Sequence, residues 1–205
     1  WETVTLDLPN ASSDYYLAFN GTAGYGYGLT IDDVCVATAS VSNEELLAFL
    51  GSGSWRSDAE TAGHIGVGPS GSTNAEWWNA NAYDKADTGL YDDRWSFADG
   101  VLTVDTGDDG AIFGKKAEID AAFPDNTPYD ADNSDNEYLY YALEDYTDTF
   151  VADATNNTIT FATNGNLGFF TSVAGQEFQI LESTENTVYL RNVGSEGNAW
   201  YNRLT

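Results

Sequence analysis

A short stretch in the first half of the chain places two adjacent tryptophans beside tyrosine, amide and carboxylate side chains. Exposed indole rings are unfavourable unless the protein or a ligand covers them. Flat aromatic rings can pack on the apolar face of a sugar, while amides and carboxylates bond its hydroxyls. The pattern predicts a glycan-binding surface formed by Trp77, Trp78, Tyr83, Tyr91, Asn79, Asn81 and Asp84. The alternative is that both indole rings pack on the protein's own sheet.

Clusters of aspartate could bind calcium, which prefers six to eight hard oxygen ligands. One pair directly follows the glycan-binding stretch, and the densest cluster lies further along the chain; the predicted Ca²⁺ ligands are Asp92, Asp93, Asp130, Asp132 and Asp135. Residues 105–109 form a further candidate. None of these clusters has the spacing of an EF-hand loop, and acidic clusters also arise by chance in so acidic a chain.

Two further patterns could carry catalysis, but neither is complete. Glu118 and Asp120 resemble the carboxylate strand of laminarinase-type glycoside hydrolases, although Ala122 and Phe123 stand where a second glutamate is needed. Retaining hydrolysis requires two carboxyl groups about 5 Å apart. A charged turn is therefore the alternative for this segment. His64 is the sole histidine and lacks the companion ligands of a zinc site, so we expect a structural role for it.

The charge of the chain restricts its partners. It has 33 acidic against 7 basic residues, a formal net charge of −26. Nucleic acid needs clustered cations and is therefore an unlikely ligand, and anionic membranes or polymers are repelled. No apolar run approaches the roughly 20 residues of a membrane span. We expect an extracellular or outer-surface protein that binds a neutral polysaccharide.

The elements that position these residues are expected to be mostly strands. Residues 1–37 contain three alternating segments, too few to form a stable sheet alone. Ser42 and Glu45 form a capping box that predicts a helix at 43–50. A hairpin turn at Ala98–Gly100 joins two strands, and Trp77–Trp78 is expected on a helical turn. Further strands are predicted at 147–151, 158–161, 168–171, 177–181, 187–191 and 199–204.

These patterns predict an all-β fold, an antiparallel sandwich or up-and-down barrel with one or two short helices. A three-stranded jelly-roll remnant precedes it. The domains expected are residues 1–38, the closing strands of an incomplete domain, and residues 39–205, a β module.

Two known families carry similar motifs. Residues Trp1–Leu8, Tyr15–Phe19 and Gly28–Val36 resemble the closing strands of choice-of-anchor J and MAM-like jelly rolls. Residues 44–205 resemble a module of secreted and cell-surface proteins of marine Bacteroidota. That resemblance rests on Trp55, His64–Pro69, Trp77–Trp78, Gly89–Asp93, Ile112–Lys116 and Ala199–Leu204. It implies a glycan-binding or adhesive role without catalytic residues.

Three functional hypotheses follow. The first is a non-catalytic, calcium-stabilised carbohydrate-binding module. The second is a structural subunit of an extracellular fibre or adhesive layer, in which residues 1–37 complete the sheet of another copy or of a cell-surface protein. The third is a glycoside hydrolase that uses Glu118 and Asp120.

Overall fold

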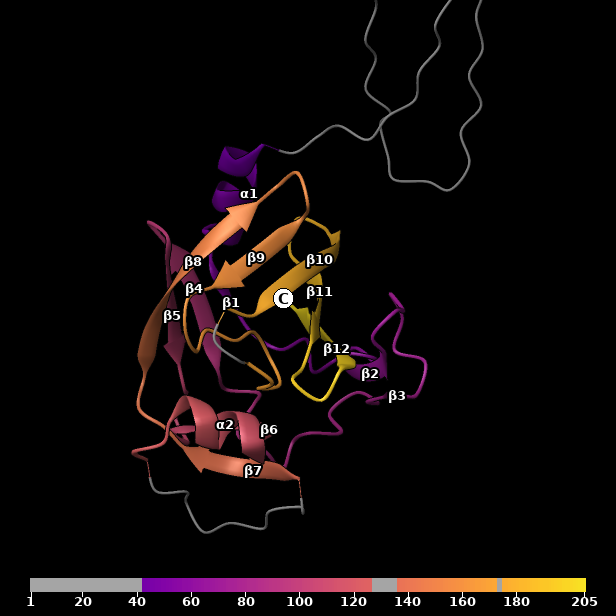
Figure 1. Cartoon of the computed structure of the whole chain (residues 1–205), viewed down its shortest axis with the longest axis vertical. Helices are drawn as coiled ribbons and strands as arrows, with labels where there is room; N and C mark the ends of the chain where they lie inside the picture. Colours follow the sequence, from indigo (N-terminus) through magenta and orange to yellow (C-terminus); the bar gives the residue numbers. More distant parts are fainter. Residues whose placement is uncertain (1–41, 127–135, 173–174) are drawn as a thin grey trace, which may run out of the picture. The chain divides into compact units, whose positions relative to one another are not determined.

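The computed structural model describes residues 42–126, 136–172 and 175–205, which form a mostly β structure (Figure 1). The elements are α1 (Asn43–Leu50), β1 (Ser54–Trp55), β2 (Ile65–Pro69), β3 (Trp78–Asn79), β4 (Arg94–Ala98), β5 (Val101–Asp105), β6 (Ala111–Lys115), α2 (Lys116–Ala122), β7 (Glu137–Ala142), β8 (Tyr146–Asp153), β9 (Thr158–Phe161), β10 (Glu177–Ser183), β11 (Val188–Val193) and β12 (Asn198–Leu204). Neither helix in these ranges is long and apolar enough to cross a membrane. The predicted strands in residues 1–37, the boundary near residue 38 and the cluster Asp130, Asp132 and Asp135 lie outside the described residues.

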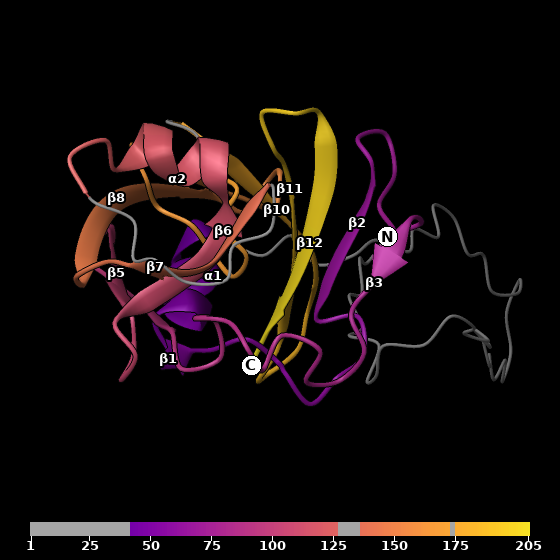
Figure 2. The ribbon, with the colours of Figure 1, turned by 90° about the horizontal axis from the view of Figure 1, so that it is seen from below.

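A curled antiparallel sheet dominates the fold, which confirms the predicted all-β class. Its ten strands run in the order β1-β4-β5-β8-β9-β10-β11-β12-β2-β3, and β6 and β7 form a separate two-stranded sheet. Figure 2 shows β6, β7 and α2 on one side and β12, β2 and β3 on the other. Burial alternates with period two along β4, β5 and β8, so one face of the sheet supplies the core.

Backbone hydrogen bonds join the residues that follow β1, at one end of the sheet, to the end of β12. The Arg56 and Thr205 backbones exchange two bonds of 2.9 Å, and Ser57 bridges to Leu204. Asp58 N–H also donates to the Arg203 carbonyl at 2.9 Å. The residues that follow β1 therefore pair with the end of β12 and close the curl into a barrel-like form.

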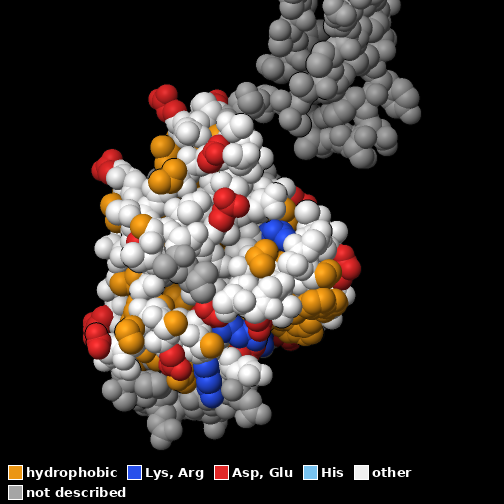
Figure 3. All heavy atoms as spheres, in the orientation of Figure 1, with side chains coloured by type: hydrophobic (Ala, Val, Ile, Leu, Met, Phe, Trp, Pro, Cys, Tyr) orange, Lys and Arg blue, Asp and Glu red, His pale blue; other side chains and the backbone are white. Residues whose placement is uncertain are grey.

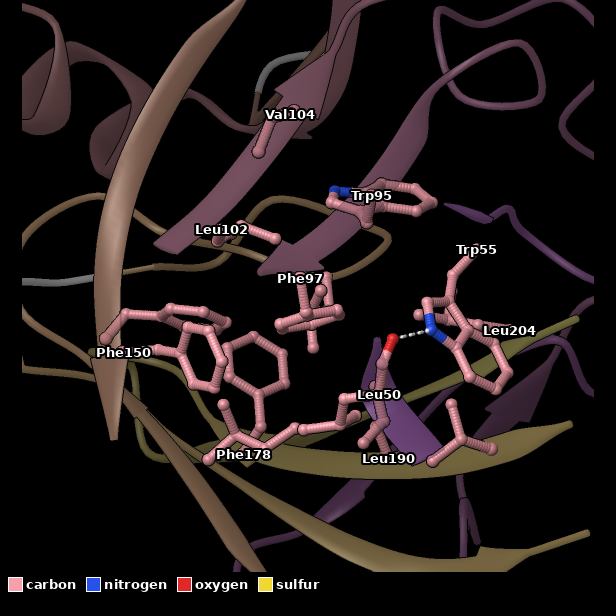
Figure 4. Close-up of a cluster of buried hydrophobic side chains, with 14 of the residues drawn as sticks. Leu50, Trp55, Trp95, Phe97, Leu102, Val104, Phe150, Phe178, Leu190 and Leu204 are labelled. Atoms are coloured by element: carbon pink, nitrogen blue, oxygen red, sulfur yellow. Dashed lines mark hydrogen bonds between the residues drawn. The ribbon is translucent and has the colours of Figure 1, made fainter. Parts of the chain in front are cut away.

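The core fills the inside of this curl (Figure 4). Helix α1 buries Leu46 and Leu50 against it, and the Trp55 indole N–H donates to the Leu50 carbonyl at 2.8 Å. Phe97 and Phe150 meet edge to face with their ring centroids 5.1 Å apart. Trp95 is buried in the same cluster.

Several elements were predicted correctly from local sequence signals. Helix α1 begins with the predicted capping box, because Ser42 and Glu45 bond each other's backbone N–H groups. The β4–β5 hairpin turns at Asp99 and Gly100, whose φ angles of 51° and 77° suit a two-residue turn. The predicted strands around 147–151, 158–161, 177–181, 187–191 and 199–204 correspond to β8, β9, β10, β11 and β12.

Two local predictions are wrong. Trp77–Trp78 does not lie on a helical turn, because Trp78 and Asn79 form β3 and pair with β2. Residues 168–171 do not form a strand; Phe170 makes only an isolated bridge to Gly114. Gly168 has a φ of +84°, outside the strand region, and packs against the Asn202 side chain. Long-range packing overrides the local pattern at both places.

Two glycines in β2 allow the segment before β3 to fold back on the strand. A Cβ added at Gly66 would lie 2.4 Å from the Ala75 Cβ and 2.8 Å from the Asn79 Oδ1. At Gly68 it would lie 2.6 Å from the Asn74 carbonyl oxygen. The close approach explains why the motif His64–Pro69 alternates glycine with larger residues.

We predict that Gly66→Ala lowers the free energy of unfolding by about 1–3 kcal/mol, because the methyl group overpacks this contact. Urea unfolding of both proteins measures the difference. Gly53→Ala is the matched control, since no atom lies within 4 Å of its added Cβ, and it should leave stability unchanged or slightly higher. Equal effects of the two substitutions would contradict the prediction.

Candidate functional site

A groove of about 240 Å³ lies where the β2–β3–β12 side of the sheet faces the β6–β7 sheet. Aromatic rings and one side chain of each charge line it; the lining residues are Ile65, Val67, Trp78, Lys85, Phe113, Glu137, Phe169 and Trp200. Figure 3 shows hydrophobic side chains gathered over the region of β2 and β3, with acidic side chains scattered over the rest of this face. The groove is thus an aromatic site on an acidic protein.

The pairing of β3 with β2 decides which tryptophan lines the groove. Trp78 lies directly opposite Val67 in the antiparallel register, so both side chains take the same face of the sheet. Trp77 precedes β3, and its backbone N–H donates to the Val67 carbonyl at 3.1 Å. Trp78 is 40% exposed and Trp77 is 59% exposed. Both residues are therefore accessible, and of the two Trp78 lines the groove.

Lysine side chains lie over the aromatic rings on both sides of the groove. The Lys85 Nζ is 5.1 Å from the ring centroids of Trp78 and Phe113, within cation–π range. The Lys115 Nζ is 4.8 Å from the Trp200 ring and 3.3 Å from the Glu137 carboxylate. Lys115 is thus neutralised by an acidic neighbour, whereas among the described residues the Lys85 ammonium contacts aromatic rings alone.

A buried hydrogen-bond network holds the loop that carries Lys85. The His64 Nδ1 lies 2.8 Å from the Thr61 carbonyl oxygen and must be the donor there, because a carbonyl only accepts. The His64 Nε2 therefore accepts from the Tyr91 hydroxyl at 2.8 Å, and that hydroxyl accepts from the Lys85 backbone N–H at 2.9 Å. Burial lowers the pKa of His64, which keeps the ring neutral.

The remaining predicted glycan contacts lie near the groove but do not line it. Tyr83 is 55% exposed and meets Tyr91 edge to face at 6.4 Å. The Asn79 side chain donates to the Ala75 carbonyl, and Asn81 donates to the Asp84 carboxylate through its backbone and its amide. These polar groups, like the Tyr91 hydroxyl, form hydrogen bonds with other groups of the protein.

The predicted calcium pair consists of one half-buried and one fully buried carboxyl. The Asp92 Oδ2 accepts from the Asp109 N–H at 3.0 Å. Asp93 is 1% exposed and its Oδ1 has no hydrogen-bond partner. Burial raises the pKa of Asp93 well above its usual range, and the charges of Asp92 and Asp109 add to the increase. Among the described residues, no group of three or more His, Cys, Asp or Glu side chains is arranged to hold a metal ion.

The two carboxylates of the hydrolase hypothesis lie on helix α2, not on a strand or in a charged turn. Glu118 is buried and accepts a hydrogen bond from the Ser195 hydroxyl. Asp120 accepts one from the Tyr138 hydroxyl at 3.0 Å. Residues two apart on a helix point in different directions, so the pair does not face one reacting bond.

A larger cavity of about 370 Å³ opens beside the loop between β5 and β6. Among the described residues its lining includes Thr106, Asn126, Glu144 and Asp145 but no aromatic side chain. The Asp145 Oδ1 already accepts from the Thr106 N–H at 3.0 Å. The cavity therefore offers polar groups without the flat apolar face found in the groove.

Comparison with protein-family models and with curated proteins finds no match for this chain. The functional argument consequently rests on the groove itself. Of its lining residues, only Trp78 was predicted from the sequence as a ligand contact. Other segments contribute contacts that were not predicted, namely Lys85, Phe113, Glu137, Phe169 and Trp200. Phe113 and Trp200 did belong to the stretches that resemble a known module, which was the one available signal.

We predict that the free energy of unfolding falls as the pH drops below the ordinary histidine value of about 6.5. The lowered pKa of His64 means that the unfolded chain binds a proton there before the folded protein does. Thr61 and the carboxylates of Asp58, Asp84 and Glu60 offset only part of the burial effect. Urea unfolding between about pH 7.5 and 5.5 should show a slope of up to about 1.4 kcal/mol per pH unit from this residue. His64→Gln should remove that component, and an unchanged slope would contradict the prediction.

We predict that Asp93→Asn raises the free energy of unfolding at pH 7 in calcium-free buffer by about 1–3 kcal/mol, because a neutral amide replaces a buried acid among like charges. Denaturant titration with and without added calcium measures this. Asp99→Asn, at the exposed β4–β5 turn, serves as the control. Loss of stability in Asp93→Asn, together with loss of calcium stabilisation, would instead support the predicted Ca²⁺ site at Asp92 and Asp93.

Proposed function

We propose that the protein is a non-catalytic carbohydrate-binding module whose ligand binds in the groove between Trp78 and Trp200. The observation that carries this proposal is the lining itself, which combines aromatic rings with a few polar groups. Ligand sites are typically concave and mostly apolar, with a small number of placed polar groups, and they are common at the mouths of β-barrels. Sugar rings offer an apolar face and hydroxyls that match both features.

The polar groups of the groove can bond hydroxyls. The Lys85 ammonium supplies donors, and the Glu137 carboxylate, held by Lys115, supplies acceptors. Donors and acceptors in one groove suit a ring that carries neighbouring hydroxyls.

The size of the groove favours a single sugar ring within a chain. Its volume of about 240 Å³ is below the roughly 300–1,000 Å³ usual for a drug-sized ligand. The net charge of −26 disfavours dense polyanions, which supports a mainly neutral polysaccharide. Such a ligand fits the extracellular or outer-surface location that we expect from the composition.

The carboxylate content of the groove favours binding over hydrolysis. In the described part of the chain a single acidic residue, Glu137, lines it, and Glu137 is paired with Lys115. Glycoside hydrolysis normally uses two carboxyl groups that flank the scissile bond. We therefore propose retention of the intact glycan as the function of this site.

We predict that Trp78→Ala weakens binding at least about tenfold, or about 1.4 kcal/mol, because it removes one aromatic wall of the groove. Isothermal titration against neutral β-glucan and mannan oligosaccharides measures the affinity. Trp77→Ala is the matched control, since Trp77 is more exposed than Trp78 and does not line the groove. It should leave affinity unchanged.

Two results would contradict this proposal in different ways. Equal losses in Trp77→Ala and Trp78→Ala would place the ligand on the exposed aromatic surface and not in the groove. The absence of binding to every oligosaccharide, with and without calcium, would contradict carbohydrate binding itself.

A further inference from the structure

Building on the proposed carbohydrate-binding function, we infer that Lys85 determines the specificity of the groove. Its preferred ligand is a largely neutral glycan in which an isolated sugar ring carries a carboxylate. The inference comes from the position of Lys85 in the groove and from the partners of the other basic residues.

All seven basic residues of the sequence lie in the described ranges, and five of them have anionic or carbonyl partners. Three pair with carboxylates, namely Arg56, Lys115 and Arg203. Arg94 and Arg191 donate to backbone carbonyls. The side chains of the other two basic residues, Lys85 and Lys116, contact aromatic rings and no anionic group among the described residues. Of these two, Lys85 lines the groove.

Among the described residues Lys85 forms no ion pair, although the chain is strongly acidic, and Glu137, the carboxylate that shares the groove, pairs with Lys115. A cation that is partly removed from water gains most from an anionic partner, because charge-assisted hydrogen bonds are roughly twice as strong as neutral ones. The rings of Trp78 and Phe113 hold the ammonium in the groove without neutralising it. A ligand carboxylate can therefore supply the missing charge.

The backbone of Lys85 is fixed independently of its side chain. Its N–H donates to the Tyr91 hydroxyl, which is anchored by the buried His64. Replacement of the side chain should therefore change the charge of the groove without releasing the loop. This separation makes Lys85 suitable for a specificity test.

The net charge of the protein limits how many acidic groups the ligand can carry. A dense polyuronate places many charges near a surface of net charge −26 and is repelled. Screening acts over about 8 Å at physiological ionic strength, so a single carboxylate in contact with Lys85 experiences mainly its near neighbours. An isolated acidic ring meets both conditions.

The test compares neutral gluco- and manno-disaccharides with their counterparts in which one C6 hydroxymethyl group is oxidised to a carboxylate. Isothermal titration with the wild-type protein should show about tenfold or tighter binding of the acidic form. Lys85→Gln should weaken binding of the acidic form much more than binding of the neutral form and so abolish this preference, whereas Lys85→Arg should retain the preference. Lys116→Gln is the matched control and should behave as wild type. The preference should also decrease as salt is raised.

The outcomes distinguish this inference from the function on which it rests. Equal binding of neutral and acidic disaccharides, or an undiminished preference in Lys85→Gln, would overturn the role of Lys85 and leave carbohydrate binding intact. Tighter binding of a long polyuronate than of the acidic disaccharide would overturn the preference for an isolated carboxylate. No binding of either disaccharide form would overturn the proposed function.

Discussion

The backbone hydrogen bonds between Arg56 and Thr205 close the curled sheet. The groove depends on this closure because it divides β12 between two pairing partners. The first part of β12 pairs with β2, whereas its end pairs with the residues that follow β1. The change of partner occurs near Arg203, whose N–H donates to the His64 carbonyl. Strands β2 and β3 can then extend beyond the closed curl, where they form one wall of the groove. The pairing also covers edges that would otherwise be open to aggregation.

Two sequence motifs that looked independent are joined by the packing. His64 begins the glycine-rich segment that becomes β2, and Tyr91 lies in the stretch before β4. Their side chains bond each other, and the Tyr91 hydroxyl also receives the Lys85 N–H. The network therefore sets the loop between β3 and β4 relative to β2. Of the residues predicted to touch sugar, Tyr91 belongs to this network and Trp78 lines the groove.

The parts of the fold that could be predicted are those set by neighbours in sequence. The cap of α1 depends on two residues three positions apart, and the β4–β5 hairpin depends on Asp99 and Gly100. The groove depends on residues from Ile65 to Trp200, brought together by strand register and by the docking of β6 on Phe170. No local pattern encodes that arrangement. Strand β3 was missed for the same reason, because it exists only where Gly66 and Gly68 admit the preceding segment.

The acidic surface and the aromatic groove are best understood together. A net charge of −26 gives the chain ample carboxylates to neutralise every cation, as happens at Arg56 and Lys115. Lys85 lies instead over two rings, which stabilise its charge while leaving its N–H donors unpaired with any carboxylate in the described residues. The same rings provide the flat apolar surface that a sugar needs. One arrangement thus supplies both stacking and a cation, and the surrounding negative charge restricts which ligands can use it.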